Sequence, residues 1–364
     1  MPASLKARLY RRVLFLVLLF WAAAASFNGF YTKGAFLEKR DSRRDFAAVI
    51  DGTAYRPFVY RNLLPFFANL ADRVAPQQIK DKLAITRNRA NEGFYEVLFD
   101  SSQALNPAYS FRYLMLYAET FLCVVGATCL MYLVCRSEGI QPLASLAASV
   151  LMILIMPYFM VEGGGNYYDY SELFFLALSV WMARKLSWWW LIPVAVLGAW
   201  NKESFLLFVF TLYPLFRRRS SQLSALFGTG LLAGICAVVY LLLRVRFHAN
   251  PGGTVENHLL QQLALFLHPA DLVIKIGKVY GILMPNAFTV IPLAILLWIV
   301  WREWSNLSLE MRWQGRIAAA INIPLYLFFC NAGEIRDLSM LFMIFLLCFG
   351  LNFKRTLRST FSNQ

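Results

Sequence analysis

Ionisable residues stand in polar segments of this sequence that border long apolar stretches. Acidic side chains of this kind can serve as a general base that takes a proton from a hydroxyl group. Asp45 and Asp51 precede one such segment, Arg56–Pro65, and Asp169 lies within a second, tyrosine-rich segment. We therefore consider Asp51, Asp169 and Asp45 as candidate catalytic carboxylates.

Basic side chains accompany these acids and point to phosphate chemistry. Fixed cations neutralise the charge that develops on a departing phosphate, and arginine grips phosphate oxygens in pairs. Nearby acids look too few to neutralise the cations, and an uncompensated cation cluster beside lipid is costly unless an anion completes it. We therefore expect the cations to converge on one phosphate site. The candidate substrate-binding residues are Arg56, Arg61, Tyr168, Lys202, Glu203 and Arg336.

Simpler interpretations exist for most of these residues. Asp51 could be a solvated loop carboxylate, and Arg56 and Arg61 could anchor the chain at lipid headgroups. The tyrosines at 167–170 could form an aromatic belt, and Val59–Val74 could be an interfacial amphipathic helix. The Lys202–Glu203 pair is harder to explain structurally, because adjacent ionisable residues between two apolar stretches are usually functional.

The composition identifies the class of protein. Of the 364 residues, 59% are hydrophobic and 15% are charged, whereas a globular domain carries about a quarter charged residues. Apolar residues form near-continuous blocks typical of segments solvated by lipid. The net charge of +14 fits the basic residues that orient membrane proteins, and no nucleic-acid-binding motif accompanies it. We expect an integral membrane protein without a nucleic-acid partner.

A metal site finds no support in the cysteines and histidines. The six cysteines form no C-x-x-C pair, and His248, His258 and His268 are ten residues apart. We assign no metal ligand. The cofactor stays open, with a divalent cation as one option.

Ten membrane spans account for the pattern of apolar blocks and basic clusters. We expect an all-α, polytopic helical bundle that forms a single domain over residues 1–364. Two long polar segments, residues 27–112 and 244–287, lie outside the membrane, the second with a partly embedded helix at Leu259–Leu267. The expected spans are Val13–Ser26 (uncleaved), Tyr113–Val134, Leu143–Met160, Leu173–Ala183, two within Trp188–Phe216, Ala225–Leu243, Phe288–Trp301, Ile317–Phe329 and Leu338–Phe353.

The stretch Trp188–Phe216 decides this count. One helix would place Asn201–Ser204 in the bilayer centre and put the basic clusters Arg184–Lys185 and Arg217–Arg219 on opposite sides. A hairpin that turns at Asn201–Ser204 keeps both clusters in the cytoplasm, together with both termini. The tip and the loop Glu162–Glu172 then face the other side. Several spans are shorter than about 20 residues, which favours a polar cleft beside them.

The sequence resembles the GT-C superfamily of polyprenyl-phosphate-sugar glycosyltransferases. A first helix precedes a long outer loop with acidic residues and several short spans. The segments Arg56–Pro65, Tyr168–Tyr170 and Asn201–Ser204 are similar to segments of uncharacterised bacterial membrane proteins with this architecture. The resemblance implies a base in the first outer loop, most naturally Asp51 and then Asp45. That loop has no Asp-x-Asp or Asp-Glu pair, so the base and the metal requirement stay open.

These observations predict a glycosyltransferase of the cell envelope that uses a lipid-linked donor at the outer face of the bacterial inner membrane. Its expected partners are that donor and membrane lipids, and its oligomeric state stays open. One alternative is a flippase or transporter of a lipid-linked or anionic substrate. Another is a polysaccharide polymerase or ligase, which differs in the length of its acceptor.

Overall fold

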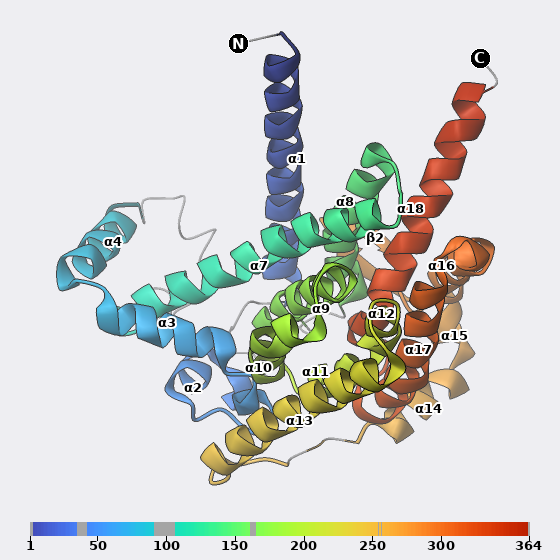
Figure 1. Cartoon of the computed structure of the whole chain (residues 1–364). Coiled ribbons are helices and arrows are strands. Elements are labelled where there is room, and N and C mark those ends of the chain that lie inside the picture. The colour runs from blue at the N-terminus through green and yellow to red at the C-terminus, as the bar shows by residue number, and fades with distance from the viewer. Residues whose placement is uncertain are drawn as a thin grey trace.

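The fold is helical throughout, apart from one two-stranded antiparallel ribbon (Figure 1). The computed structural model describes residues 3–34, 42–90, 106–160, 165–253, 255 and 257–362. Its first helices are α1 (Ala3–Gly34), α2 (Phe46–Asp51), α3 (Leu63–Val74), α4 (Gln77–Ala90), α7 (Ser110–Ser137), α8 (Pro142–Phe159), α9 (Tyr167–Lys185) and α10 (Ile192–Asn201).

The second half of the chain continues the bundle and adds the ribbon. Short 3-10 helices also occur, among them η2 (Phe58–Tyr60), η4 (Val209–Leu212) and η6 (Ile335–Leu338). The remaining elements are α11 (Phe205–Phe208), α12 (Tyr213–Arg217), α13 (Gln222–Arg246), α14 (Leu259–Leu267), α15 (Pro269–Val273), β1 (Ile276–Val279), β2 (Ile282–Pro285), α16 (Val290–Glu303), α17 (Leu309–Phe329) and α18 (Ser339–Ser362).

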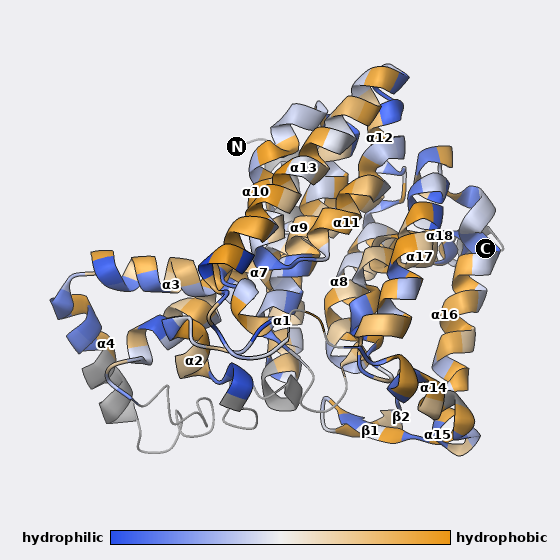
Figure 2. Ribbon diagram, turned by 90° about the horizontal axis from the view of Figure 1, so that it is seen from below, coloured by the Kyte–Doolittle hydropathy of each residue, from blue (hydrophilic) through white to orange (hydrophobic). Residues whose placement is uncertain are grey.

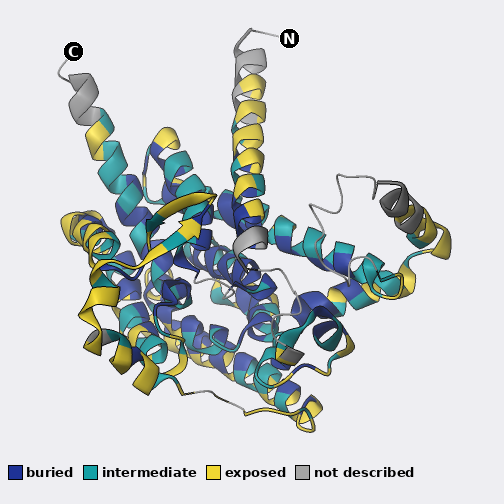
Figure 3. Ribbon diagram, turned by 180° about the vertical axis from the view of Figure 1, so that it is seen from behind, coloured by how far each residue is buried: buried dark blue, intermediate teal, exposed yellow. Residues whose placement is uncertain are grey.

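Within the described part of the chain, five helical segments are long and apolar enough to cross a membrane, so the chain is a multi-pass membrane protein. They are Val13–Phe30, Ser110–Ser137, Pro142–Phe159, Gln222–Arg246 and Ile335–Leu357. Apolar residues cover much of α13, which is one of these five, and also much of α10 and α16 (Figure 2). Exposed residues gather on the projecting part of α1 and on the ribbon (Figure 3).

The bundle has a basic end, which we define by the turns around Glu138, Arg184, Arg219 and Glu303. Arg184 forms a buried ion pair with Glu138, and Arg219 Nη1 donates to the Arg184 carbonyl at 2.9 Å. Arg355 Nη2 lies 3.1 Å from Glu303 Oε2. Basic clusters far apart in the sequence therefore meet at one end of the bundle.

The polar end lies opposite and includes Asn201–Ser204 and the first turns of α9. Lys202 Nζ lies 2.7 Å from Glu172 Oε2, whereas Arg219 contacts Arg184. Glu172 and Arg184 are separated by about 18 Å along α9, at 1.5 Å per residue. The predicted hairpin is thus confirmed in the fold: α10 runs to the polar end, and α11, η4 and α12 return.

Gly198 allows this hairpin to close. A Cβ atom at position 198 would lie 2.8 Å from the Phe205 ring. Such a contact is too short for carbon atoms, so a larger residue would push α11 away from α10. Glycine here sets the close approach of the two limbs.

The structure corrects two boundaries and adds one element. α1 continues to Gly34, where we expected the first span to end at Ser26. The residues Tyr167–Glu172 are buried in the first turns of α9, where we expected a loop, because Asn166 and Asp169 form a capping box. Glu162 lies outside the described residues. The predicted helix at Leu259–Leu267 is confirmed as α14, whereas the ribbon was not expected.

Labelling of single cysteines can test which ends face the same compartment. In a background without the six native cysteines, we expect an impermeant thiol reagent to reach Ser204→Cys and Asn257→Cys from one side. Ser187→Cys, which lies at the basic end, should react only from the other side. Equal labelling of Ser204→Cys and Ser187→Cys in intact cells would contradict this arrangement.

Candidate functional site

Two hollows open at the polar end. The larger, which we call the Lys202 cavity, has a volume of about 590 Å³ and receives side chains from the 43–61 region, α9, the hairpin tip and η6. The smaller, which we call the Asp51 pocket, has a volume of about 430 Å³ and is bounded by α2, α3, the start of α7 and the end of α13. Both volumes are typical of small-molecule sites.

Lys202 occupies the centre of a buried ion network. Its Nζ atom lies 2.7 Å from Glu172 Oε2, 3.4 Å from Asp337 Oδ1 and 3.7 Å from Asp169 Oδ1. The residue is only 8% exposed. An ammonium group removed from water needs such partners, because its desolvation costs several kcal/mol. The network therefore fixes the hairpin tip against α9 and η6.

Hydroxyl groups complete the coordination of Glu172. Its Oε1 atom accepts hydrogen bonds from Ser204 Oγ at 2.9 Å and from Ser339 Oγ at 3.0 Å. With Lys202 on its other oxygen, this carboxylate is bound on both sides. Glu172 is therefore well suited to hold helices together and poorly placed to accept a substrate proton.

Arg336 joins two further carboxylates of the cavity. Its Nη1 atom donates to Asp169 Oδ2 at 2.5 Å, and its Nη2 atom donates to Glu334 Oε2 at 3.3 Å. Asp169 Oδ2 also accepts the Asn166 backbone N–H at 2.8 Å. Asp169, a predicted catalytic carboxylate, is thus engaged as a helix cap and an ion-pair partner.

Arg61 binds Glu203 in a two-pronged pair. Arg61 Nε donates to Glu203 Oε2 at 3.0 Å, and Nη2 donates to Oε1. The guanidinium also donates to the Tyr168 hydroxyl and lies 4.5 Å from the centre of that ring. Planar pairing of this kind is the strongest form of arginine–carboxylate contact.

Pairing determines the ionisation of these groups. Burial acts to lower the pKa of Lys202, but Glu172 and Asp337 outweigh it and hold that pKa above its ordinary value. Burial acts to raise the pKa of Glu203, but Arg61 outweighs it and lowers that pKa. Burial raises the pKa of Glu334. Lys202 and Glu203 therefore remain charged at neutral pH.

The structure brings three of the four predicted cations together and neutralises them. Arg61, Lys202 and Arg336 line the Lys202 cavity, whereas Arg56 lines neither hollow. The expectation that nearby acids would be too few is wrong. The carboxylates that pair with these cations are Asp169, Glu172, Glu203, Glu334 and Asp337.

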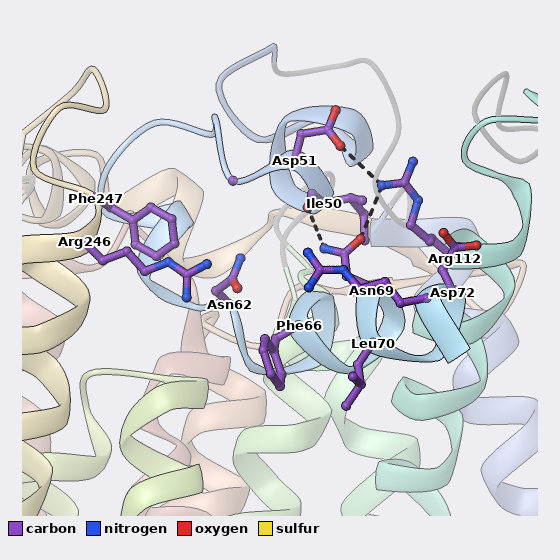
Figure 4. Close-up of a pocket in the computed structure, with 12 residues that line it drawn as sticks. Ile50, Asp51, Asn62, Phe66, Asn69, Leu70, Asp72, Arg112, Arg246 and Phe247 are labelled. Atoms are coloured by element: carbon purple, nitrogen blue, oxygen red, sulfur yellow. Dashed lines mark hydrogen bonds and ion pairs between the residues drawn. The ribbon is translucent and has the colours of Figure 1, made fainter. Parts of the chain in front are cut away.

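The Asp51 pocket contains a more accessible carboxylate (Figure 4). Asp51 Oδ2 accepts a hydrogen bond from the Tyr109 hydroxyl at 2.5 Å, and Oδ1 lies 3.4 Å from Arg112 Nη1. The Asp51 side chain is 40% exposed. Its two partners orient the carboxylate while one side stays open to solvent. Asp45, the other first-loop candidate, caps α2 by accepting the Ala48 N–H at 2.7 Å.

Two further arginines give the Asp51 pocket an excess of positive charge. Arg73 and Arg246 line it, are exposed, and have no carboxylate partner among the described residues. The second acid of the pocket, Asp72, pairs with Lys80 at 3.0 Å. Apolar side chains complete the walls, namely Ile50, Phe66, Leu70 and Phe247.

Sequence reasoning missed the arginines of this pocket. Arg112 and Arg246 stand beside predicted spans at the ends we assigned to the outer side, where basic residues are less common. That departure from the usual charge bias was the available signal. Arg73 lies in the amphipathic stretch of α3 and carries no comparable signal.

The segment 57–66 contributes side chains to both hollows. Pro57, Phe58 and Arg61 line the Lys202 cavity, whereas Asn62 and Phe66 line the Asp51 pocket.

No family model matches the sequence, and a comparison with curated proteins finds no match either. Among the described residues, no group of three or more histidine, cysteine or acidic side chains is placed to hold a metal ion.

Substitution of Lys202 should reveal the weight of its network. Lys202→Met leaves three carboxylates without their shared cation, so we expect a loss of about 3–5 kcal/mol in the free energy of unfolding. Thermal unfolding of the purified protein in detergent measures the effect.

Lys80→Met is the matched control, because Lys80 pairs with Asp72 near the surface and should contribute at most about 1 kcal/mol. Adding Glu172→Gln to Lys202→Met should recover part of the loss, since it removes one orphaned charge. Equal destabilisation by Lys202→Met and Lys80→Met would contradict the role of the network.

Proposed function

We propose that the protein is a membrane glycosyltransferase that takes its sugar from a polyprenyl-phosphate donor. The Asp51 pocket carries this proposal, because it combines three features in one hollow. It has an accessible carboxylate in Asp51, two arginines, Arg73 and Arg246, with no carboxylate partner in the described part of the chain, and apolar walls. Transfer from a lipid phosphate requires a base, cations for the phosphate and an apolar path for the lipid.

The proposed reaction assigns a role to each group. Asp51 accepts the proton of an acceptor hydroxyl as its oxygen attacks the anomeric carbon of the sugar. The bond from that carbon to the phosphate oxygen breaks, and the electron pair stays on the phosphate. Arg112, Arg73 and Arg246 stabilise the resulting negative charge.

The outer face of α3 suits the lipid part of the donor. Phe67, Leu70 and Val74 are exposed large apolar residues on this helix, and Leu70 also lines the Asp51 pocket. An amphipathic helix at a membrane surface buries such side chains among acyl chains. A polyprenyl chain that packs along α3 would bring its phosphate to the arginines.

The proposed orientation follows the charge distribution. Ten segments would cross the membrane, with the basic end and both termini in the cytoplasm, as the positive-inside bias favours. The polar end, with both hollows, then faces the outside of a bacterial inner membrane. α1 would stay attached as the first span.

A carrier is the second candidate, and the buried ion pairs of the Lys202 cavity favour it. Buried ionisable residues between membrane helices often mark a transport path. A carrier needs no base and would lose transport when Lys202 is replaced, whatever stands at position 51. A polymerase or ligase would share the proposed chemistry and differ only in the acceptor.

Replacement of Asp51 separates the enzyme from the carrier. Asp51→Asn should lower transfer by roughly 10²–10⁴-fold while donor binding persists, because the amide keeps the shape but accepts no proton. The measurement is transfer of radiolabelled sugar from lipid-linked donors in isolated membranes, together with binding of a fluorescent polyprenyl phosphate.

Asp72→Asn is the matched control in the same pocket, since Asp72 is already paired with Lys80. Arg246→Gln should weaken binding of the polyprenyl phosphate. Near-normal transfer by Asp51→Asn would exclude Asp51 as the base, and near-normal transfer by Asp51→Asn, Asp169→Asn and Asp45→Asn alike would exclude the proposed carboxylate-base mechanism.

A further inference from the structure

The Lys202 cavity has no role in the reaction proposed above, although it is the larger hollow. Its charges are balanced among the described residues that line it or contact its cations. Five basic residues line it, namely Arg43, Arg44, Arg61, Lys202 and Arg336. Five acidic residues line it or contact its cations, namely Asp169, Glu172, Glu203, Glu334 and Asp337. A ligand therefore meets donors and acceptors but little net charge.

Charged ligands fit this cavity poorly. A phosphate would enter beside carboxylates that already hold Arg61, Lys202 and Arg336, and like-charge contacts cost several kcal/mol. A cation would face the same difficulty with the basic side chains. Displacing an existing partner would leave a buried charge unpaired, which is also costly.

Neutral polar ligands with many hydroxyl groups fit well. A hydroxyl group both donates and accepts, so it can bind to either kind of charged side chain without breaking the ion pairs. Aromatic rings of Phe58, Tyr240 and Phe329 also line the cavity and offer apolar surfaces. Further hydrogen-bonding side chains line the cavity, namely Asn166, Ser204, His258, Gln261, Asn322 and Asn331.

We propose that the Lys202 cavity binds an uncharged carbohydrate, which serves as the acceptor. The identification as acceptor rests on the proposed glycosyl transfer, whereas the binding of a neutral sugar rests on the cavity alone. The segment 57–66 contributes side chains to both the cavity and the Asp51 pocket. The proposed acceptor site and the proposed base are therefore connected by one short stretch of chain.

Saturation-transfer NMR of the full-length protein tests this inference. The protein is purified in lauryldimethylamine oxide, because detergents with sugar headgroups would compete. The probes are glucose, N-acetylglucosamine and maltose, with inorganic pyrophosphate as an anionic probe followed by phosphorus NMR. We expect saturation transfer from the wild-type protein to at least one of these sugars when the sugar is present at millimolar concentration.

Variants locate the binding. Phe329→Ala and Asn331→Ala change exposed residues at the cavity wall and should weaken sugar binding about tenfold, the loss of one or two good contacts. Asp72→Asn changes a residue that lies outside the cavity and has no role in the proposed reaction, so it should leave sugar binding unchanged. Thermal unfolding confirms that each variant is folded.

Three results would overturn the inference. The first is no saturation transfer to any of the three sugars, and the second is saturation transfer that Phe329→Ala and Asn331→Ala leave unchanged. The third is pyrophosphate binding that is lost in these two wall variants but kept in Arg246→Gln. If the wild-type protein binds a sugar and Asp51→Asn still transfers sugar from the donor at the normal rate, Asp51 is excluded as the base. The carbohydrate site then stays in place. The two proposals can thus fail separately.

Discussion

The need to neutralise Lys202 inside the bundle determines the arrangement of the polar end. An unpaired ammonium group removed from water would cost several kcal/mol, so the hairpin tip must lie where carboxylates are available. Those carboxylates come from the first turns of α9 and from η6, namely Glu172, Asp169 and Asp337. The level at which α10 ends is therefore fixed by the level at which α9 begins. The contact of Lys202 with Asp337 alone bridges 135 residues of the chain.

Arg61 extends the same constraint to the segment before α3. Its pairing with Glu203 and Tyr168 attaches η2 to the hairpin tip and to α9. This attachment positions α3, which follows directly, and with it the pocket that contains Asp51. Additional backbone contacts hold the region from the other side, since Asn250 Nδ2 donates to the carbonyls of Gly52 and Ala54 at 2.9 Å. The smaller hollow thus depends on the ion pairs that line the larger one.

The sequence was sufficient for the long apolar helices and for the hairpin, because both follow from local properties. Apolar blocks predict helices, and the basic clusters at 184–185 and 217–219 require the chain to turn at Asn201–Ser204. The neutralisation of Arg61, Lys202 and Arg336 could not be predicted in this way. Their carboxylate partners come from segments that meet only in three dimensions, and Tyr167–Glu172 reads as a loop until its capping box is seen. For the same reason the sequence named Asp51 as a candidate base but did not name the arginines around it.

The two hollows differ in whether their cations are paired with carboxylates, and this difference favours different ligands in each. In the Lys202 cavity each buried cation already has a carboxylate, so an added anion gains little. In the Asp51 pocket Arg73 and Arg246 have no carboxylate partner among the described residues, so an anion there gains two new contacts. α13 contributes to both hollows, with Tyr240 in the cavity wall and Arg246 in the pocket wall. These two residues are about 9 Å apart along the helix axis. A neutral sugar near Tyr240 and a phosphate near Arg246 would therefore bind at neighbouring levels of α13, and Asp51 is the accessible carboxylate on the phosphate side.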